Sequence, residues 1–323
     1  MALGKGNERT DIKVASERAV LAALHLPDAD LDEADPLGEL RALAETAGAE
    51  VVGEIIQKKN RPEAGTFIGT GKVEEIKRLC EGADAKVVIF DNDLSPAQIT
   101  NLQEAIGRKI IDRSELILDI FAGRATTHEA KLQVELAQLE YTYPRLRAMW
   151  DHLERIVGGA GGMAGIGTRG PGEQQLEIDR RLVRNRLTQL RRELAELQAR
   201  KRREVQKRRQ DHFTVGLVGY TNAGKSTLFN TLTEGGAYAA NKLFATLMTR
   251  TREWDLGDGL RVMLSDTVGF VRDLPHDLVA SFKATLEEAT HADVLLIVLD
   301  VADPNAERQL AVVHRTLDEL FED

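Results

Sequence analysis

The chain has 323 residues, and 52 acidic against 43 basic side chains give it a formal net charge of −9. This length predicts two or three domains, each able to bury a core, and the acidic balance excludes a molecule that is basic over its whole surface. The single cysteine, Cys80, excludes an internal disulfide and a multi-cysteine metal site, and it favours a reducing cytosol. No apolar run approaches the roughly 20 residues that cross a bilayer, and no signal-peptide pattern opens the chain, so we expect neither membrane insertion nor secretion.

The first third of the chain alternates short apolar runs with helical patterns, which predicts a small parallel α/β sheet. We assign residues 1–124 to this N-terminal subdomain. Ser95 is a natural N-cap, and Pro96 suits the first turn of the helix that follows. The expected strands are residues 17–24, 51–56, 86–90 and 109–112, and the expected helices are residues 37–47, 71–80 and 95–106.

One short stretch of this subdomain imitates a phosphate-binding loop. In residues 69–72, Gly-Thr-Gly-Lys, a glycine pair precedes a lysine. The spacing of a true phosphate loop is absent, so we interpret the stretch as a turn that leads into a helix.

Residues 125–211 have the pattern of two long helices. Apolar residues recur at alternating steps of four and three, which predicts an antiparallel hairpin with a coiled-coil seam. We expect its second helix to run from about Glu173 to Gln210, roughly 55 Å at 1.5 Å per residue, so its tip is either exposed or buried in a partner. The seam residues are Leu132, Leu136, Leu139, Tyr143 and Leu146 in the first helix and Val183, Leu187, Leu190, Leu194 and Leu197 in the second.

The predicted connection between the helices, residues 158–172, is dense in glycine and also carries Met163, Ile166 and Arg169. A flexible connection is the simple alternative, but a helical hairpin needs only a few residues there, so we favour a functional tip. The second helix is basic, and its charges could serve only as a solvated exterior. A glycine-rich tip on a basic hairpin instead favours a partner with a phosphate backbone. The basic residues are Arg180, Arg181, Arg184, Arg191, Arg192 and a cluster at residues 200–209.

Residues 219–227 read Gly-Tyr-Thr-Asn-Ala-Gly-Lys-Ser-Thr, which is a full phosphate-binding loop between an apolar strand and a helical segment. A chance match is the alternative, but this context predicts nucleoside triphosphate binding. Backbone N–H groups at the helix start can bind phosphate oxygens. Lys225 can reach the β- and γ-phosphates, and the Ser226 hydroxyl can bind Mg²⁺.

Two further motifs follow the loop at the spacing that nucleotide hydrolysis requires. Asp266 would hold a Mg²⁺-bound water, the Gly269 N–H would contact the γ-phosphate, and Thr246 would supply another Mg²⁺ ligand. The expected catalytic residues are Lys225, Thr246, Gly269 and Phe270, the last in place of a glutamine. The expected nucleotide contacts are Gly219, Tyr220, Thr221, Asn222, Ala223, Gly224, Lys225, Ser226, Thr227, Phe244, Ala245, Thr246, Leu247, Met248, Asp266, Thr267, Val268 and Gly269.

Residues 219–226, 243–246 and 266–276, together with the glycine loop ending at residues 168–173, resemble the HflX family of GTPases. The resemblance covers nearly the whole chain. It implies an α/β part and a helical hairpin, then a P-loop GTPase domain at residues 212–323 that uses GTP and Mg²⁺.

The resemblance also implies a partner, the large ribosomal subunit, with the glycine loop approaching the rRNA of the peptidyl-transferase centre. It implies separation of stalled or idle ribosomes, notably under heat stress. We expect a monomer in the cytoplasm that associates with ribosomes or peripherally with membrane. The expected ribosome contacts are Gly158, Gly159, Gly161, Gly162, Arg169, Arg180, Arg181 and Arg184.

The chain departs from related GTPases at three places. Phe270 replaces a water-orienting glutamine, so unaided hydrolysis should be slow and the ribosome is the expected activator. Residues 247–252 read Leu-Met-Thr-Arg-Thr-Arg where the family has Leu-Asp-Pro-Thr-Thr-Arg, which should change the mobility or contacts of this switch segment. The Asn-Lys-x-Asp motif that selects guanine does not occur, so we interpret the sequence as a fragment. The apolar run at residues 294–299 is expected as a buried strand, with a sheet edge and an apolar face exposed beyond it.

Two other functions fit the sequence. The first is a low-turnover regulatory switch that docks its hairpin on an acidic protein surface. A ribosome binder would instead lose affinity steeply with salt and require rRNA. The second is an ATPase or a nucleotide binder without base selectivity, which competition between GTP and ATP would distinguish.

Overall fold

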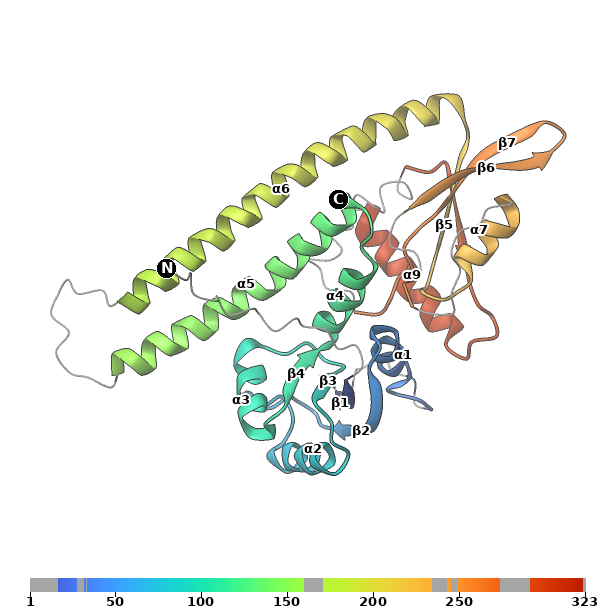
Figure 1. Cartoon of the computed structure of the whole chain (residues 1–323). Coiled ribbons are helices and arrows are strands. Elements are labelled where there is room, and N and C mark those ends of the chain that lie inside the picture. Colours follow the sequence, from blue (N-terminus) through green and yellow to red (C-terminus); the bar gives the residue numbers. More distant parts are fainter. Residues whose placement is uncertain are drawn as a thin grey trace. The chain divides into compact units, whose positions relative to one another are not determined.

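A computed structural model describes residues 17–27, 32, 34–159, 171–233, 243–244, 249–273 and 291–321, with residues 146–159, 171–179, 202 and 204–211 described by their backbone alone. The chain divides into two compact units, Met1–Gly123 and Arg124–Asp323 (Figure 1). In the described part of the chain, no helix has the length and apolar character needed to cross a membrane. The predicted further division of the second unit at residue 211 stays a prediction.

The first unit is a four-stranded sheet with the order β2-β1-β3-β4, and every neighbouring pair is parallel. The predicted parallel α/β subdomain is therefore confirmed, with element ends that differ by a few residues. Its strands are β1 (Arg18–His25), β2 (Glu50–Lys58), β3 (Val87–Phe90) and β4 (Lys109–Asp112). Its helices are α1 (Gly38–Ala47), α2 (Thr70–Gly82), α3 (Pro96–Ile106) and α4 (Arg113–Arg124), the last ending at the boundary of the units.

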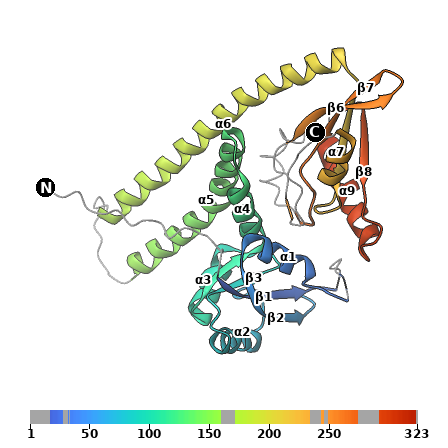
Figure 2. The ribbon, with the colours of Figure 1, turned by 45° about the vertical axis from the view of Figure 1, so that its right-hand side comes forward.

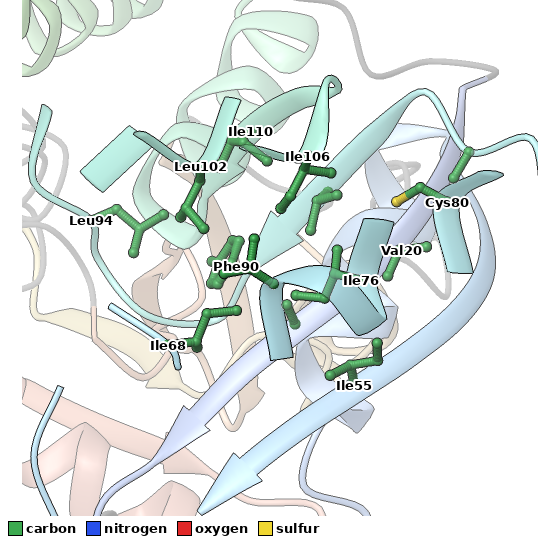
Figure 3. Close-up of a cluster of buried hydrophobic side chains, with 14 of the residues drawn as sticks. Val20, Ile55, Ile68, Ile76, Cys80, Phe90, Leu94, Leu102, Ile106 and Ile110 are labelled. Carbon is green, nitrogen blue, oxygen red and sulfur yellow. The ribbon is translucent and has the colours of Figure 1, made fainter. Parts of the chain in front are cut away.

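A large core joins α2 and α3 to one face of this sheet (Figure 3). Ile76 and Cys80 of α2 and Leu102 of α3 pack in the same cluster as Phe90 of β3, and all four are at most 1% exposed. Alternate residues of a strand point to opposite faces, so the apolar residues of β1 serve cores on both sides. Near-continuous burial of β1 and β3 is typical of a parallel strand covered on both faces.

Two local predictions in this unit are confirmed. The Ser95 side chain accepts from the Gln98 N–H, and the Gln98 side chain accepts from the Ser95 N–H, so α3 begins with a reciprocal capping box. Gly69 is the residue that precedes α2, and Lys72 lies in the first turn of that helix, where it pairs with Glu75 at 2.7 Å. The imitation of a phosphate loop is a turn that leads into a helix.

A buried ion-pair network lies where β3 and β4 end. Arg113, at the start of α4, is 1% exposed and donates to Asp91 after β3 and to Glu39 of α1, both at 2.7 Å. Asp112, which is fully buried, accepts from the Glu115 N–H at 2.9 Å and thereby caps α4. Charges this deep in a protein require such partners, so the network ties three elements of the first unit together.

In the second unit, α5 (His128–Gly159) and α6 (Pro171–Asp211) form an antiparallel hairpin (Figures 1 and 2). The predicted seam is confirmed wherever its side chains are described, because one cluster contains them; Leu146 lies outside the described side chains. The predicted connection was too long, because α5 continues to Gly159 and α6 already begins at Pro171. Proline is well suited to the first turn of a helix, which explains the start of α6. The clustered residues are Leu132, Leu136, Leu139, Tyr143, Val183, Leu187, Leu190, Leu194 and Leu197.

Polar bridges between the two helices fix their register. Glu135 accepts two hydrogen bonds from Arg186, each at 2.7 Å, and Glu140 accepts from Arg191 at 2.7 Å. Both bridges join residues that are 51 positions apart. Part of the basic face of α6 is therefore neutralised within the hairpin.

The rest of the second unit is a sheet with the order β6-β7-β5-β8, parallel except for the β6–β7 pair. A cluster including Val215, Leu217, Phe229 and Leu264 joins the sheet to α7. The strands are β5 (Thr214–Gly219), β6 (Arg250–Gly257), β7 (Leu260–Asp266) and β8 (Val294–Val298), and the helices are α7 (Lys225–Thr233) and α9 (Ala306–Phe321).

The expectation that residues 294–299 form a buried strand was wrong. Val294, Leu296 and Ile297 of β8 are 41%, 38% and 37% exposed. Among the described strands β8 pairs only with β5, so it lies at an edge of the sheet. The predicted exposed edge with apolar side chains is present at this strand.

Candidate functional site

The phosphate-binding motif forms the connection between β5 and α7. Gly219 ends β5 with φ +153°, and a Cβ atom there would lie 2.3 Å from the Val298 carbonyl oxygen of β8. Only glycine permits this approach, which brings the start of the loop against the neighbouring strand. The first turn of α7 begins at Lys225, so N–H groups that have no acceptor within the helix lie beside the loop, in the arrangement that binds phosphate oxygens.

Lys225 is folded into the loop itself. Its side chain is 5% exposed, and Nζ donates to the carbonyl oxygens of Tyr220 at 2.7 Å and Gly219 at 3.1 Å. Burial lowers the pKa of Lys225 to about 8, while the charge of Asp266 acts in the opposite direction. This buried cation is placed to contact a phosphate group at the loop.

Ser226 and Asp266 meet at the carboxyl edge of the sheet. Asp266 is the last residue of β7 and pairs with Leu217 of β5, and its Oδ2 accepts a hydrogen bond from the Ser226 hydroxyl at 2.7 Å. Hydroxyl and carboxylate oxygens are the ligands that Mg²⁺ prefers, so these two side chains fit a Mg²⁺ ion. Within the described residues, no group of three or more His, Cys, Asp or Glu side chains could hold a metal.

The segment after Asp266 lies directly against the phosphate loop. Thr267 donates its hydroxyl to the Leu217 carbonyl at 2.7 Å. A Cβ atom on Gly269 would lie 2.6 Å from the Thr221 Cα, so this position also requires glycine. The backbone of Phe270 donates to the Gly219 carbonyl at 3.1 Å and accepts from the Thr221 N–H at 2.7 Å.

The side chain of Phe270, the residue in the usual glutamine position, is 2% exposed and therefore belongs to the core. Phe244 is 1% exposed, and its N–H donates to the Thr221 hydroxyl at 2.9 Å. The structure thus brings three separate motifs to one place: the phosphate loop, the segment at residues 266–270, and Phe244.

Several predicted site residues are elsewhere or are not described. Gly158 and Gly159 lie in the last turn of α5 rather than in a loop. Arg181 and Arg184 are exposed on α6, and Arg180 is partly exposed; Arg184 donates to the Tyr143 hydroxyl at 2.7 Å. The positions that lie outside the described residues are Ala245, Thr246, Leu247 and Met248 of the switch segment and Gly161, Gly162 and Arg169 of the tip.

One contact at this site could not be predicted from the sequence. The Tyr220 hydroxyl accepts a hydrogen bond from the Arg272 N–H at 2.9 Å. Tyr220 was expected only as a loop member, and Arg272 had no expected role. No sequence signal marks the pair, because it depends on how the chain after β7 continues beside β5.

Three family models match successive parts of the chain. Residues 34–122 match the N-terminal region of GTP-binding GTPases, and residues 124–209 match the middle region of the same proteins. Residues 214–322 match a model described as a 50S ribosome-binding GTPase.

The chain is similar to curated proteins over most of its length. The protein named GTPase HflX from Caldanaerobacter subterraneus subsp. tengcongensis is 48% identical over 305 residues, which cover 94% of this chain and 69% of that protein. GTPase HflX from Escherichia coli strain K12 is 48% identical over 308 residues, covering 95% of this chain and 70% of that protein. The crystal structure of SsGBP in complex with GDP matches with a TM-score of 0.53 and 25% identity, over 94% of this chain and 78% of that one.

Proposed function

The chain belongs to the HflX family of GTPases, and from that premise we propose that its GTP hydrolysis serves the large ribosomal subunit. In this proposal the protein binds the subunit through its hairpin and splits or rescues stalled and idle ribosomes, especially under heat stress. It acts as a monomer in the cytoplasm.

The meeting of Ser226, Lys225 and Asp266 supports the nucleotide part of this proposal most directly. Lys225 would leave the loop carbonyls to bind the β- and γ-phosphates, and the N–H groups at the start of α7 would bind the remaining phosphate oxygens. Ser226 and, through a water, Asp266 would hold Mg²⁺, with Thr246 as the proposed third ligand. When bound, Mg²⁺ neutralises charge that develops on the phosphates during transfer.

The position of Phe270 supports slow hydrolysis by the protein alone. A phenyl side chain in the core can neither orient a water nor donate to the γ-phosphate, and only its backbone lies beside the loop. Gly269 is close enough to the loop for its N–H to contact the γ-phosphate. The missing positioning must then come from outside the chain, for which the ribosome is our candidate.

The hairpin supports the ribosomal part. Arg181 is exposed on α6, in the part of this helix with described side chains that lies nearest to the glycine-rich connection. The ion pairs of Glu135 and Glu140 engage other arginines, Arg186 and Arg191. Exposed arginines bind RNA phosphates without reading sequence. We propose that residues 160–170 reach rRNA near the peptidyl-transferase centre and that α6 contacts the phosphate backbone beside them.

Large ribosomal subunits should accelerate steady-state GTP turnover by at least about tenfold. An activator that supplies missing positioning or charge can raise the rate of hydrolysis by a factor of up to roughly 10³–10⁵. Turnover is measured at one GTP concentration with increasing amounts of purified large subunits, at low and high salt. Stimulation should fall steeply with salt, as expected for contacts with RNA phosphates.

The matched control is a chain without residues 160–170. Because the seam and bridges of α5 and α6 lie outside this loop, the variant should keep its unstimulated turnover and lose both stimulation and ribosome splitting, the latter read by sucrose-gradient sedimentation. Equal turnover with and without subunits for the intact chain would contradict the ribosomal proposal and favour the regulatory switch. Effective competition of labelled GTP by ATP would favour a nucleotide binder without base selectivity.

GTP affinity should decrease as the pH rises above 8. Lys225 has a pKa of about 8 in the protein without nucleotide, whereas the phosphates of GTP favour its charged form, so binding above this pH takes up a proton. The linkage predicts a loss of up to about tenfold per pH unit. Dissociation constants at pH 7, 8 and 9 test this; Lys225→Arg, whose guanidinium stays charged, should be much less sensitive to pH. Parallel profiles for the two proteins would contradict the assignment.

A further inference from the structure

A line of hydrogen bonds continues the parallel pairing of β5 and β7 beyond the ends of both strands. In its first bond the Thr267 hydroxyl donates to the Leu217 carbonyl. The next two are backbone bonds of Phe270, one to the Gly219 carbonyl and one from the Thr221 N–H. Tyr220 and Phe270 form an isolated parallel bridge at this point. The last bond in the line is the one from the Arg272 N–H to the Tyr220 hydroxyl, at 2.9 Å.

The final bond differs from the others between residues 268–272 and the phosphate loop, because its acceptor is a side chain. Tyr220 is 7% exposed, so its ring is packed and its hydroxyl has a fixed position. Tyrosine loses little conformational freedom when it is packed, having two χ angles, which suits it to hold a backbone N–H in place. The same residue offers its carbonyl to Lys225 at 2.7 Å.

We infer that Tyr220 is a positioning residue for GTP hydrolysis, whose hydroxyl holds the segment after Gly269 against the phosphate loop. The inference rests on the proposed GTP hydrolysis at this site. The Gly269 N–H must face the γ-phosphate, and Phe270 must stay in the core rather than enter the nucleotide site. Both conditions depend on the placement of residues 269–272, which Tyr220 sets from the side of the loop.

The Tyr220→Phe variant tests this role, because it removes one hydroxyl and keeps the packed ring. The Arg272 amide should exchange hydrogen about two to ten times faster, the range expected for loss of one net hydrogen bond. The kcat of GTP turnover should fall by a similar factor of about two to ten, with KM and GTP affinity unchanged within about twofold, the signature of a contribution made only in the transition state. Tyr143→Phe is the matched control: it also removes a tyrosine hydroxyl that accepts from an arginine, and its unstimulated turnover should equal that of the parent protein.

Each outcome bears on the inference. A kcat equal to or above that of the parent protein overturns it, even where the Arg272 amide exchanges faster. Unchanged exchange at Arg272 overturns the hydrogen bond on which it rests. A parallel loss of kcat and GTP affinity would make Tyr220 a binding residue instead. If the parent protein does not hydrolyse GTP at all, the proposed function fails and the positioning role fails with it, while the exchange measurement still tests the contact.

Discussion

Replacing Lys225 with alanine should weaken GTP binding by about a hundredfold or more. In the proposed complex its ammonium group contacts two phosphates, and each hydrogen bond to a charged group contributes about 1.5–3 kcal/mol. The change leaves the first-turn N–H groups of α7 and the Ser226 hydroxyl in place, so the loss measures the lysine alone. Equilibrium binding of a fluorescent GTP analogue to both proteins gives the ratio.

The chain offers a matched control for this variant in Lys72. Like Lys225, that lysine directly follows a glycine, but it lies at the start of α2 and pairs with Glu75. Lys72→Ala should leave GTP affinity unchanged. Far-ultraviolet circular dichroism checks that Lys225→Ala keeps its fold, since the carbonyls of Gly219 and Tyr220 lose a donor in this variant. A GTP affinity for Lys225→Ala close to that of the parent protein would contradict the assignment of the site.

Replacing Arg113 with alanine should lower the free energy of unfolding of the first unit by about 3–5 kcal/mol. The guanidinium is 1% exposed and neutralises Asp91, which is itself buried, so the variant leaves a buried carboxylate without its cation. A change of this size is a large fraction of the stability of a single domain.

Cys80 reports this loss directly, because it is the only cysteine of the chain and is fully buried in α2. Burial also raises the pKa of its thiol, which further suppresses reaction in the folded unit. A thiol reagent should label Arg113→Ala about 10²–4 × 10³ times faster than the parent protein, the factor that corresponds to 3–5 kcal/mol when opening is in rapid equilibrium.

Arg18→Ala is the control for Arg113→Ala, since Arg18 pairs with Glu50 at 3.8 Å on the surface and such pairs contribute about 0–1 kcal/mol. Both tryptophans, Trp150 and Trp254, belong to the second unit. The unfolding transition that their fluorescence reports should therefore have the same midpoint denaturant concentration in every variant. Labelling of Arg113→Ala at the rate of Arg18→Ala would show that the network contributes little.

Sequence patterns identified the elements whose residues carry a local period or a local cap. The seam of α5 and α6 follows from apolar spacing, and the start of α3 follows from Ser95 and Gln98. The exposure of the β8 side chains could not be predicted in this way. An apolar run indicates a strand, but its exposure depends on how many neighbouring strands pair with it, and β8 has one among those described.

The candidate site likewise contains some contacts that local sequence patterns predict and others that they do not. The phosphate loop, Ser226 and Asp266 could be predicted because motif spacing relates them to one chemistry, and the structure places the latter two 2.7 Å apart. The contacts of Arg113 with Glu39, 74 positions away, and of Tyr220 with Arg272, 52 positions away, could not. Each depends on where the parallel strands of one sheet end relative to one another, and no single segment contains that information.

The two bridges of the hairpin have a consequence for protein engineering. Because each joins residues 51 positions apart, well below the connection, the register of α5 and α6 does not depend on the length of chain between Gly159 and Pro171. In general, doubling the length of a loop adds only about 0.6 kcal/mol to the entropic cost of closing it. We therefore expect that foreign peptides, affinity tags or crosslinkable amino acids can be inserted between these two residues without changing how α5 and α6 pair.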